Sequence, residues 1–357
     1  MRRLFARKTS NACPRATARE AANRVFLAAF GKHPGWNDHI DDLGLETELL
    51  VQVKRTLYLD GISGNVDSGA WEKLSEAQRL EGFDHRFLYR REQKGERGKG
   101  RGEHGGGKER GEQDGTGGEV VVGRMWSSMD GKGRTRYPMV VCAHCCGLPL
   151  SWVLQQVLPR LEDIRTRCVN TTSSLAVKAM LDDTRRQLRE LTQQVEASSP
   201  DPGMPEGTLA VLARSPEMGK DHVGLLRVLY KIEQGMPADD ARGGQPATRV
   251  VPGSLHVRVP ACADSPPNTI RLWLSFLLEE LDSSNAMILL LPLGERWIDI
   301  IVGQPSAREF YCIRASLEAV PRTTDIPYTL APGFLEQAER RIAASVGARA
   351  TPLMEDR

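Results

Sequence analysis

The sequence predicts a mixed α/β protein of the α+β kind, with two domains that each contain a largely antiparallel sheet flanked by helices. The chain has 357 residues, which is more than the ~100–200 residues of an ordinary domain. In both halves, apolar runs of strand length alternate with segments of helical spacing. Short turns separate several of these runs, whereas a parallel nucleotide-binding sheet needs a helix between successive strands.

In the first half, apolar runs predict four strands and amphipathic spacing predicts the helices. The strands are expected at 25–30, 83–89, 119–126 and 137–144. Helices are expected at 43–59, ended by Gly61 and Gly64, then in a short segment that begins at Ser68, and at 152–164 and 173–195.

The second half repeats this alternation after a break at 198–203, where Pro and Gly interrupt the chain. Strands are expected at 208–213, 254–259, 286–291, 297–302 and 310–314. Helices are expected at 223–233, 270–281 and 332–346, the last beginning at a proline. We therefore predict one domain at 25–197 and a second at 205–350.

Two segments are predicted to be disordered. Residues 1–24 form a basic leader without the apolar stretch of a secretory signal. Residues 90–118 contain Gly, Lys, Arg and Glu but no apolar residue, so they cannot bury surface. The sheet tolerates such an insertion because the closure cost grows only logarithmically with loop length.

Composition excludes several classes of protein. The formal net charge of +2 argues against a dedicated nucleic-acid binder, which usually has a strongly basic face. No apolar run approaches the ~18–20 residues that span a bilayer, so no membrane insertion is expected. The seven cysteines lie mostly within apolar segments, which indicates reduced thiols and a cytoplasmic protein.

Two clusters contain groups that could bind a metal. His33, Asp38 and His39 follow the first strand, and imidazole with carboxylate suits a divalent ion; alternatively, Asp38 caps the next helix. Cys142 and Cys145 have zinc-knuckle spacing, but no second pair follows. Strand alternation places Cys142 and His144 on one face and Cys145 on the other, so buried structural thiols are the favoured interpretation.

The segment from Gly123 to Pro138 is rich in glycine and cations, which suits an anion or a partner. It is not a phosphate-binding Walker loop, because the glycine and hydroxyl positions are wrong. Alternatively it is a plain hairpin turn, with Asp130-Gly131 in the left-handed region. No recognised catalytic frame appears, so no catalytic residue and no cofactor are predicted.

These loops resemble two motifs of the TagF (ImpM) family, accessory proteins of bacterial type VI secretion. The first motif corresponds to Phe30, Gly31, Lys32, Pro34 and Asp38, and the second to Gly123, Ser128, Asp130, Gly133, Arg134, Tyr137, Pro138 and Met139. The resemblance covers about residues 25–195. It departs from the family at His39, in the spacing between Arg134 and Tyr137, and in the 90–118 insertion.

The resemblance implies a non-catalytic cytoplasmic regulator that acts after translation by contacting a forkhead-associated scaffold. We expect the two loops to meet at one sheet edge and to bind a protein partner. The expected partner-binding residues are Lys32, Trp36, Asp38, Ser128, Asp130 and Arg134. The alternatives are a metal-dependent hydrolase that uses His33, Asp38 and His39, and a structural component of the secretion apparatus. The oligomeric state and the role of the second half do not follow from the sequence.

Overall fold

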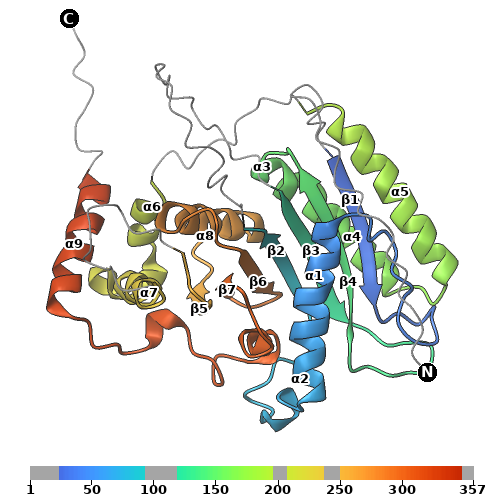
Figure 1. The fold of residues 1–357 in the computed structure, drawn as a ribbon, viewed down its shortest axis with the longest axis horizontal. Helices are drawn as coiled ribbons and strands as arrows, with labels where there is room; N and C mark the ends of the chain where they lie inside the picture. Colours follow the sequence, from blue (N-terminus) through green and yellow to red (C-terminus); the bar gives the residue numbers. More distant parts are fainter. Residues whose placement is uncertain (1–23, 93–118, 196–206, 237–249, 348–357) are drawn as a thin grey trace, which may run out of the picture.

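The computed structural model describes residues 24–92, 119–195, 207–236 and 250–347, and its centre is one antiparallel sheet (Figure 1). The seven strands lie in the order β1-β4-β3-β2-β6-β7-β5. Their bounds are β1 Arg24–Gly31, β2 His85–Arg90, β3 Val120–Ser127, β4 Pro138–Cys146, β5 Ser254–Pro260, β6 Met287–Pro292 and β7 Trp297–Gly303.

The helices of the first half flank the strands that this half contributes. They are α1 Glu48–Val53, η1 Lys54–Ser63 with π-type turns, α2 Gly64–Asp67, η2 Trp71–Lys73, α3 Leu150–Trp152, η3 Val153–Val157, α4 Leu158–Cys168 and α5 Ser174–Thr192. The helices of the second half gather at the other end of the sheet (Figure 1). They are α6 Thr208–Arg214, η4 Pro216–Met218, η5 Lys220–His222, α7 Val223–Gln234, α8 Pro266–Glu280, η6 Glu309–Arg314, η7 Thr323–Asp325 and α9 Pro332–Gly347.

The prediction of an α+β protein with a largely antiparallel sheet and flanking helices is confirmed. The two halves, however, share one sheet instead of having one each. Strand β2 of the first half pairs with β6 of the second, from His85 opposite Pro292 to Arg90 opposite Met287. Both strands are almost entirely buried, so this shared ladder lies in the interior of the protein.

Each face of the sheet has its own apolar core, as alternation along a strand requires. One face packs against α3, α4 and α5 in the first half and against α6 to α9 in the second. The opposite face packs against α1, η1, η2 and η6. The predicted alternation at the end of β4 is confirmed, since Cys142 belongs to the second core and Cys145 to the first.

Two predicted strands are wrong. Residues 208–213 form helix α6, in which nearly every residue is buried, and a short all-apolar run does not distinguish a buried strand from a buried helix. Residues 310–314 form the 3-10 helix η6. A further strand has no place beside β7, because β5 and β6 already pair with its two edges.

The predicted end of the first long helix is also wrong, because helical turns continue through Gly61 and Gly64 to Asp67. Both glycines allow close packing instead. A Cβ at Gly61 would lie 2.5 Å from the Phe310 ring, and one at Gly64 would lie 2.8 Å from Cβ of Ala307. Ser68 follows α2 as its C-terminal cap and does not begin the next helix.

Several sequence predictions lie outside the described residues. These are the leader up to residue 23, the insertion from 93 to 118 and the domain break at 198–203. Arg90, the expected first residue of the insertion, is instead the buried last residue of β2, and its guanidinium donates a hydrogen bond to Ser283 O at 3.1 Å. Within the described part of the chain, no helix is both long and apolar enough to cross a membrane.

Candidate functional site

Two loops that are far apart in sequence meet at one edge of the sheet. Strands β1 and β3 both pair with β4 in antiparallel fashion, so the carboxyl ends of β1 and β3 point toward the same edge. The loop after β1 contains the first motif, and the loop between β3 and β4 contains the second. The strand order therefore brings the two motifs to the same edge of the sheet, as expected.

The backbone of the first loop turns at Gly31, whose φ is 104°. A Cβ there would lie 2.2 Å from Pro138 O, so only glycine fits. The Lys32 N–H then donates to Pro138 O at 3.1 Å, and the Ile40 N–H donates to Gly31 O at 2.7 Å. These bonds close the loop at both ends and hold it against the start of β4.

The second loop is a tight turn that touches the first. The Gly133 N–H donates to Asp130 O at 2.9 Å, and the Gly131 N–H donates to Trp36 O at 2.6 Å. Gly133 has a φ of 77°, so the left-handed residue of this turn is Gly133 and not the predicted Asp130-Gly131 pair. The bond to Trp36 joins the two loops through their backbones.

An ionic network fixes the two loops to each other. The Lys32 ammonium lies 2.7 Å from a carboxylate oxygen of Asp130 and 2.7 Å from one of Asp38. The Arg134 guanidinium donates to Asp130 at 2.6 Å and lies 3.1 Å from Asp38. It also donates to Asn37 O at 3.0 Å. Two cations and two carboxylates thus link residues about a hundred positions apart.

The network holds the Asp130 carboxylate in its charged form. Burial alone would raise the pKa of this carboxyl, but bonds from Lys32, from the backbone N–H groups of Arg134 and Lys132 and from the Arg134 side chain outweigh it and hold the pKa well below its usual range. The bond from Lys32 likewise lowers the pKa of Asp38. The cluster is therefore a preformed set of charges at neutral pH.

Burial separates the predicted residues into those that support the two loops from inside and those that lie on the surface of the loops. The side chain of Lys32 is 4% exposed and that of Asp130 is fully buried, so both residues hold the loops from inside, which differs from the surface contact expected of them. Arg134 and Asp38 are half-exposed or more, at 50% and 67%. Lys132, which sequence reasoning did not single out, is exposed at the tip of the second loop.

Trp36 and Ser128 are partly buried. The Trp36 ring packs against the first core and lies edge-on to His33, with ring centroids 5.6 Å apart. The Lys178 ammonium lies 5.9 Å from the centroid of the Trp36 ring. Trp36 therefore supports the loop as well as facing its surface. Within the described residues, Ser128 makes no hydrogen bond to the ionic network.

The geometry does not support the metal alternative at His33, Asp38 and His39. His33 is buried, its Nδ1 accepts a hydrogen bond from the Gly35 N–H at 3.0 Å, and its Nε2 lies 3.2 Å from Cys168 O, to which it donates. Both ring nitrogens are thus in use. Asp38 and His39 contact each other at 3.0 Å. Asp38 does not cap the next helix either, since Thr47 caps α1.

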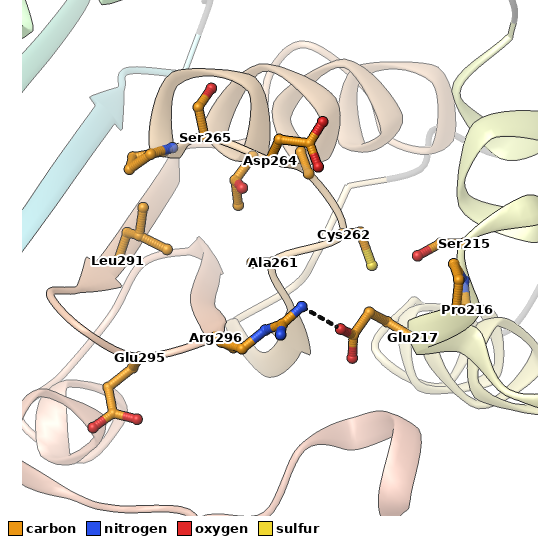
Figure 2. A pocket seen from close by; sticks show the side chains of 13 residues that line it. Ser215, Pro216, Glu217, Ala261, Cys262, Asp264, Ser265, Leu291, Glu295 and Arg296 are labelled. Carbon is orange, nitrogen blue, oxygen red and sulfur yellow. Dashed lines mark hydrogen bonds and ion pairs between the residues drawn. The ribbon is translucent and has the colours of Figure 1, made fainter.

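The second half has a surface hollow of about 660 Å³ between η4, the β5–α8 connection and the β6–β7 turn (Figure 2). Arg296 points across it toward Glu217 (Figure 2). Its guanidinium donates a hydrogen bond of 2.9 Å to the Glu217 carboxylate. Burial raises the pKa of the Cys262 thiol in this hollow to about 11. Because that thiol stays protonated at neutral pH, it is a poor nucleophile, and among the described residues that line the hollow there is no histidine to activate it.

Of these arrangements, the one held together by the most specific contacts is the sheet edge where the loop after β1 meets the loop between β3 and β4. We call it the two-loop edge. Comparison with known proteins adds no relative: no family model matches the chain, and no curated protein matches it.

Proposed function

We propose that this chain is a non-catalytic accessory protein of a type VI secretion-like system, which regulates assembly by binding a protein partner through the two-loop edge. The observation that carries this proposal is the ionic network. The residues of the two resembling motifs lie 98 positions apart at Lys32 and Asp130 and are in direct contact. A buried and satisfied pair of this kind fixes the shape of the loops on which the surface groups stand.

The surface of this edge favours an acidic partner. Residues 131–136 are all exposed and include Lys132, Arg134 and Arg136. Two exposed carboxylates face them: Asp38 contacts Arg134 at 3.1 Å, and Glu72 contacts Arg136 at 2.9 Å. Exposed cations on a rigid turn speed the approach of a negatively charged surface and set its orientation. The partner expected from the resemblance is a forkhead-associated scaffold protein.

Binding kinetics with purified proteins test this proposal. The full chain is immobilised, and the forkhead-associated scaffold protein of the same secretion system is passed over it at several salt concentrations. The double variant Lys132→Glu/Arg134→Glu should slow association and reduce its dependence on ionic strength, because the reversed charges repel an acidic partner. Trp36→Ala is a less direct test, since it also removes a partly buried ring.

A matched control reverses two cations elsewhere. Arg186→Glu/Arg189→Glu lies on exposed positions of α5 and makes the same change in net charge. It should bind the scaffold as the unchanged protein does. The proposal is contradicted if the unchanged protein does not bind the scaffold, or if both double variants bind equally well.

A regulator differs from a structural component in what its loss does. Deleting the gene should increase assembly of the secretion apparatus while the abundance of its subunits stays constant. Stable co-purification with assembly subunits, together with loss of assembly on deletion, would instead identify a structural component.

A further inference from the structure

A second group of polar residues lies at the opposite end of β4 from the two loops. Glu119 precedes β3. His144 and Cys146 are the last two residues of β4 on the face that packs against α1. Cys146 Sγ lies 3.2 Å from His144 Nε2, and Glu119 Oε2 lies 4.0 Å from the same nitrogen. The three potential ligand atoms all lie within 4.8 Å of one another.

Helix α1 orients the imidazole of His144. The Nδ1 atom lies 3.0 Å from Thr47 Oγ1, and this oxygen also accepts the Leu50 N–H as the cap of α1. A hydrogen bond at Nδ1 leaves the lone pair of Nε2 for the thiol and carboxylate side. Metal-binding histidines are usually held by such a bond at their other nitrogen. Burial lowers the pKa of His144 to about 4, so the ring is neutral at physiological pH.

The arrangement differs from that of a cysteine nucleophile with a catalytic histidine. In a catalytic triad the acid contacts the nitrogen opposite the nucleophile. Here Glu119 and Cys146 face the same nitrogen, and Thr47 occupies the other. One nitrogen, one sulfur and one carboxylate oxygen that converge on a common point are the ligands that zinc prefers.

The other described cluster with metal-ligand chemistry does not fit. His256, Asp299 and Cys312 also lie close together. However, Arg258 binds both carboxylate oxygens of Asp299, at 2.8 Å and 3.0 Å. A guanidinium stays charged, so it would repel a metal ion at that carboxylate.

From this geometry we infer that Glu119, His144 and Cys146 bind one zinc ion, whose fourth ligand comes from outside this group. The site is accessible, since the Glu119 side chain is 50% exposed and Cys146 is partly exposed. It ties the start of β3 and the end of β4 to the first turn of α1. It is separate from the two-loop edge, because the register of β1 and β4 places Gly31 and Arg24 at opposite ends of the pairing.

Metal titration of the reduced full-length chain tests this inference. The protein is freed of metal with a chelator and titrated with zinc chloride, and separately with cobalt chloride. We expect one zinc per chain, release of the thiol proton on binding, and a sulfur-to-cobalt charge-transfer band with the intense visible bands of tetrahedral cobalt. Cys146→Ser should remove the charge-transfer band and stoichiometric binding, and Glu119→Gln should weaken binding but keep the band.

Two further variants separate ligation from folding. Thr47→Val should weaken zinc binding about 10–100-fold, as removal of an orienting group does, whereas Thr47→Ser should restore it. Cys142→Ser and Cys312→Ser change buried thiols outside the group and should bind zinc normally. Absence of stoichiometric binding, a charge-transfer band retained in Cys146→Ser, unchanged affinity in Glu119→Gln, or loss in Cys142→Ser would each overturn the assignment. None of these results depends on partner binding at the two-loop edge.

Discussion

The ammonium of Lys32 lies 2.7 Å from the carboxylate of Asp130, although 98 positions separate the two residues along the chain. Both side chains are buried, and the backbones of their loops are also joined, through Gly131 and Trp36. A buried charge that loses its partner is costly, whereas a surface pair contributes little. The contact therefore predicts which substitutions at this edge affect stability.

Replacing Lys32 by Met should lower the free energy of unfolding by about 3 kcal/mol or more, because it removes one partner of a buried ion pair. Urea unfolding followed by far-UV circular dichroism measures the change. Lys54→Met is the matched control, since Lys54 pairs with Asp42 nearer the surface, and it should cost less than about 1 kcal/mol. Equal losses in the two variants would show that the buried network does not stabilise the fold.

Gly31→Ala should destabilise the protein by about 3 kcal/mol or more, because it adds strain at positive φ to a clash. The new Cβ would lie 2.2 Å from Pro138 O. Gly133→Ala is the control: its φ is also positive, but no atom lies within 4 Å of the new Cβ. It should cost only about 1–2 kcal/mol. Thermal unfolding measures both variants, and similar losses would contradict the role of close packing at Gly31.

Stability should fall as the pH is lowered from 7 to 5, and His85 should account for part of the loss. Burial lowers the pKa of His85 to about 4 in the folded state, whereas an unfolded histidine has a pKa of about 6.5. The unfolded chain thus takes up the proton first, so stability is lost as the pH falls below about 6.5. At pH 5, this residue lowers the free energy of unfolding by on the order of 2 kcal/mol.

The variant His85→Leu should lose less stability than the unchanged protein between these two pH values. Urea unfolding at pH 7 and at pH 5 measures the difference. Phe87→Leu, two residues along the same face of β2, should lower stability by the same amount at both pH values because it leaves a cavity and no titrating group. A His85→Leu variant that keeps the full pH dependence would contradict the assignment.

The Arg258–Asp299 pair in the second half should show strong coupling in a double-mutant cycle. Both residues are almost fully buried, and the guanidinium also donates to Ser316 O, Val320 O and Cys312 O. Asp299→Leu should cost about 3–5 kcal/mol, whereas Arg258→Met/Asp299→Leu should cost less than the two single losses together. The exposed pair Arg322–Asp325 should couple by less than about 1 kcal/mol.

Strand positions were largely predictable because buried strands are continuous apolar runs. Seven of the nine predicted strands correspond to β1 to β7 in the described residues. The run at 208–213 was not predictable, because a run that is apolar on every side has no period to distinguish helix from strand. Gly61 and Gly64 indicated a helix end. In the structure, Phe310 and Ala307 instead occupy the space that a side chain at each glycine would fill.

The candidate site was predictable in part. The meeting of the two loops follows from their position at strand ends, but the burial of Lys32 depends on carboxylates from both loops, which the sequence does not place in three dimensions. The group at Glu119 was missed for a similar reason. Attention to the CxxC spacing paired Cys142 with Cys145, while strand alternation, which correctly placed Cys142 and His144 on one face, also places Cys146 on that face.

The ladder between β2 and β6 has a consequence for attempts to study either half alone. A fragment that ends after α5 would leave β2 with one row of backbone N–H and C=O groups unpaired, next to the apolar side chains of Phe87 and Leu88. Such an open edge recruits strands from other molecules. Each half expressed by itself should therefore self-associate, whereas co-expressed halves can complete each other by supplying the missing neighbour.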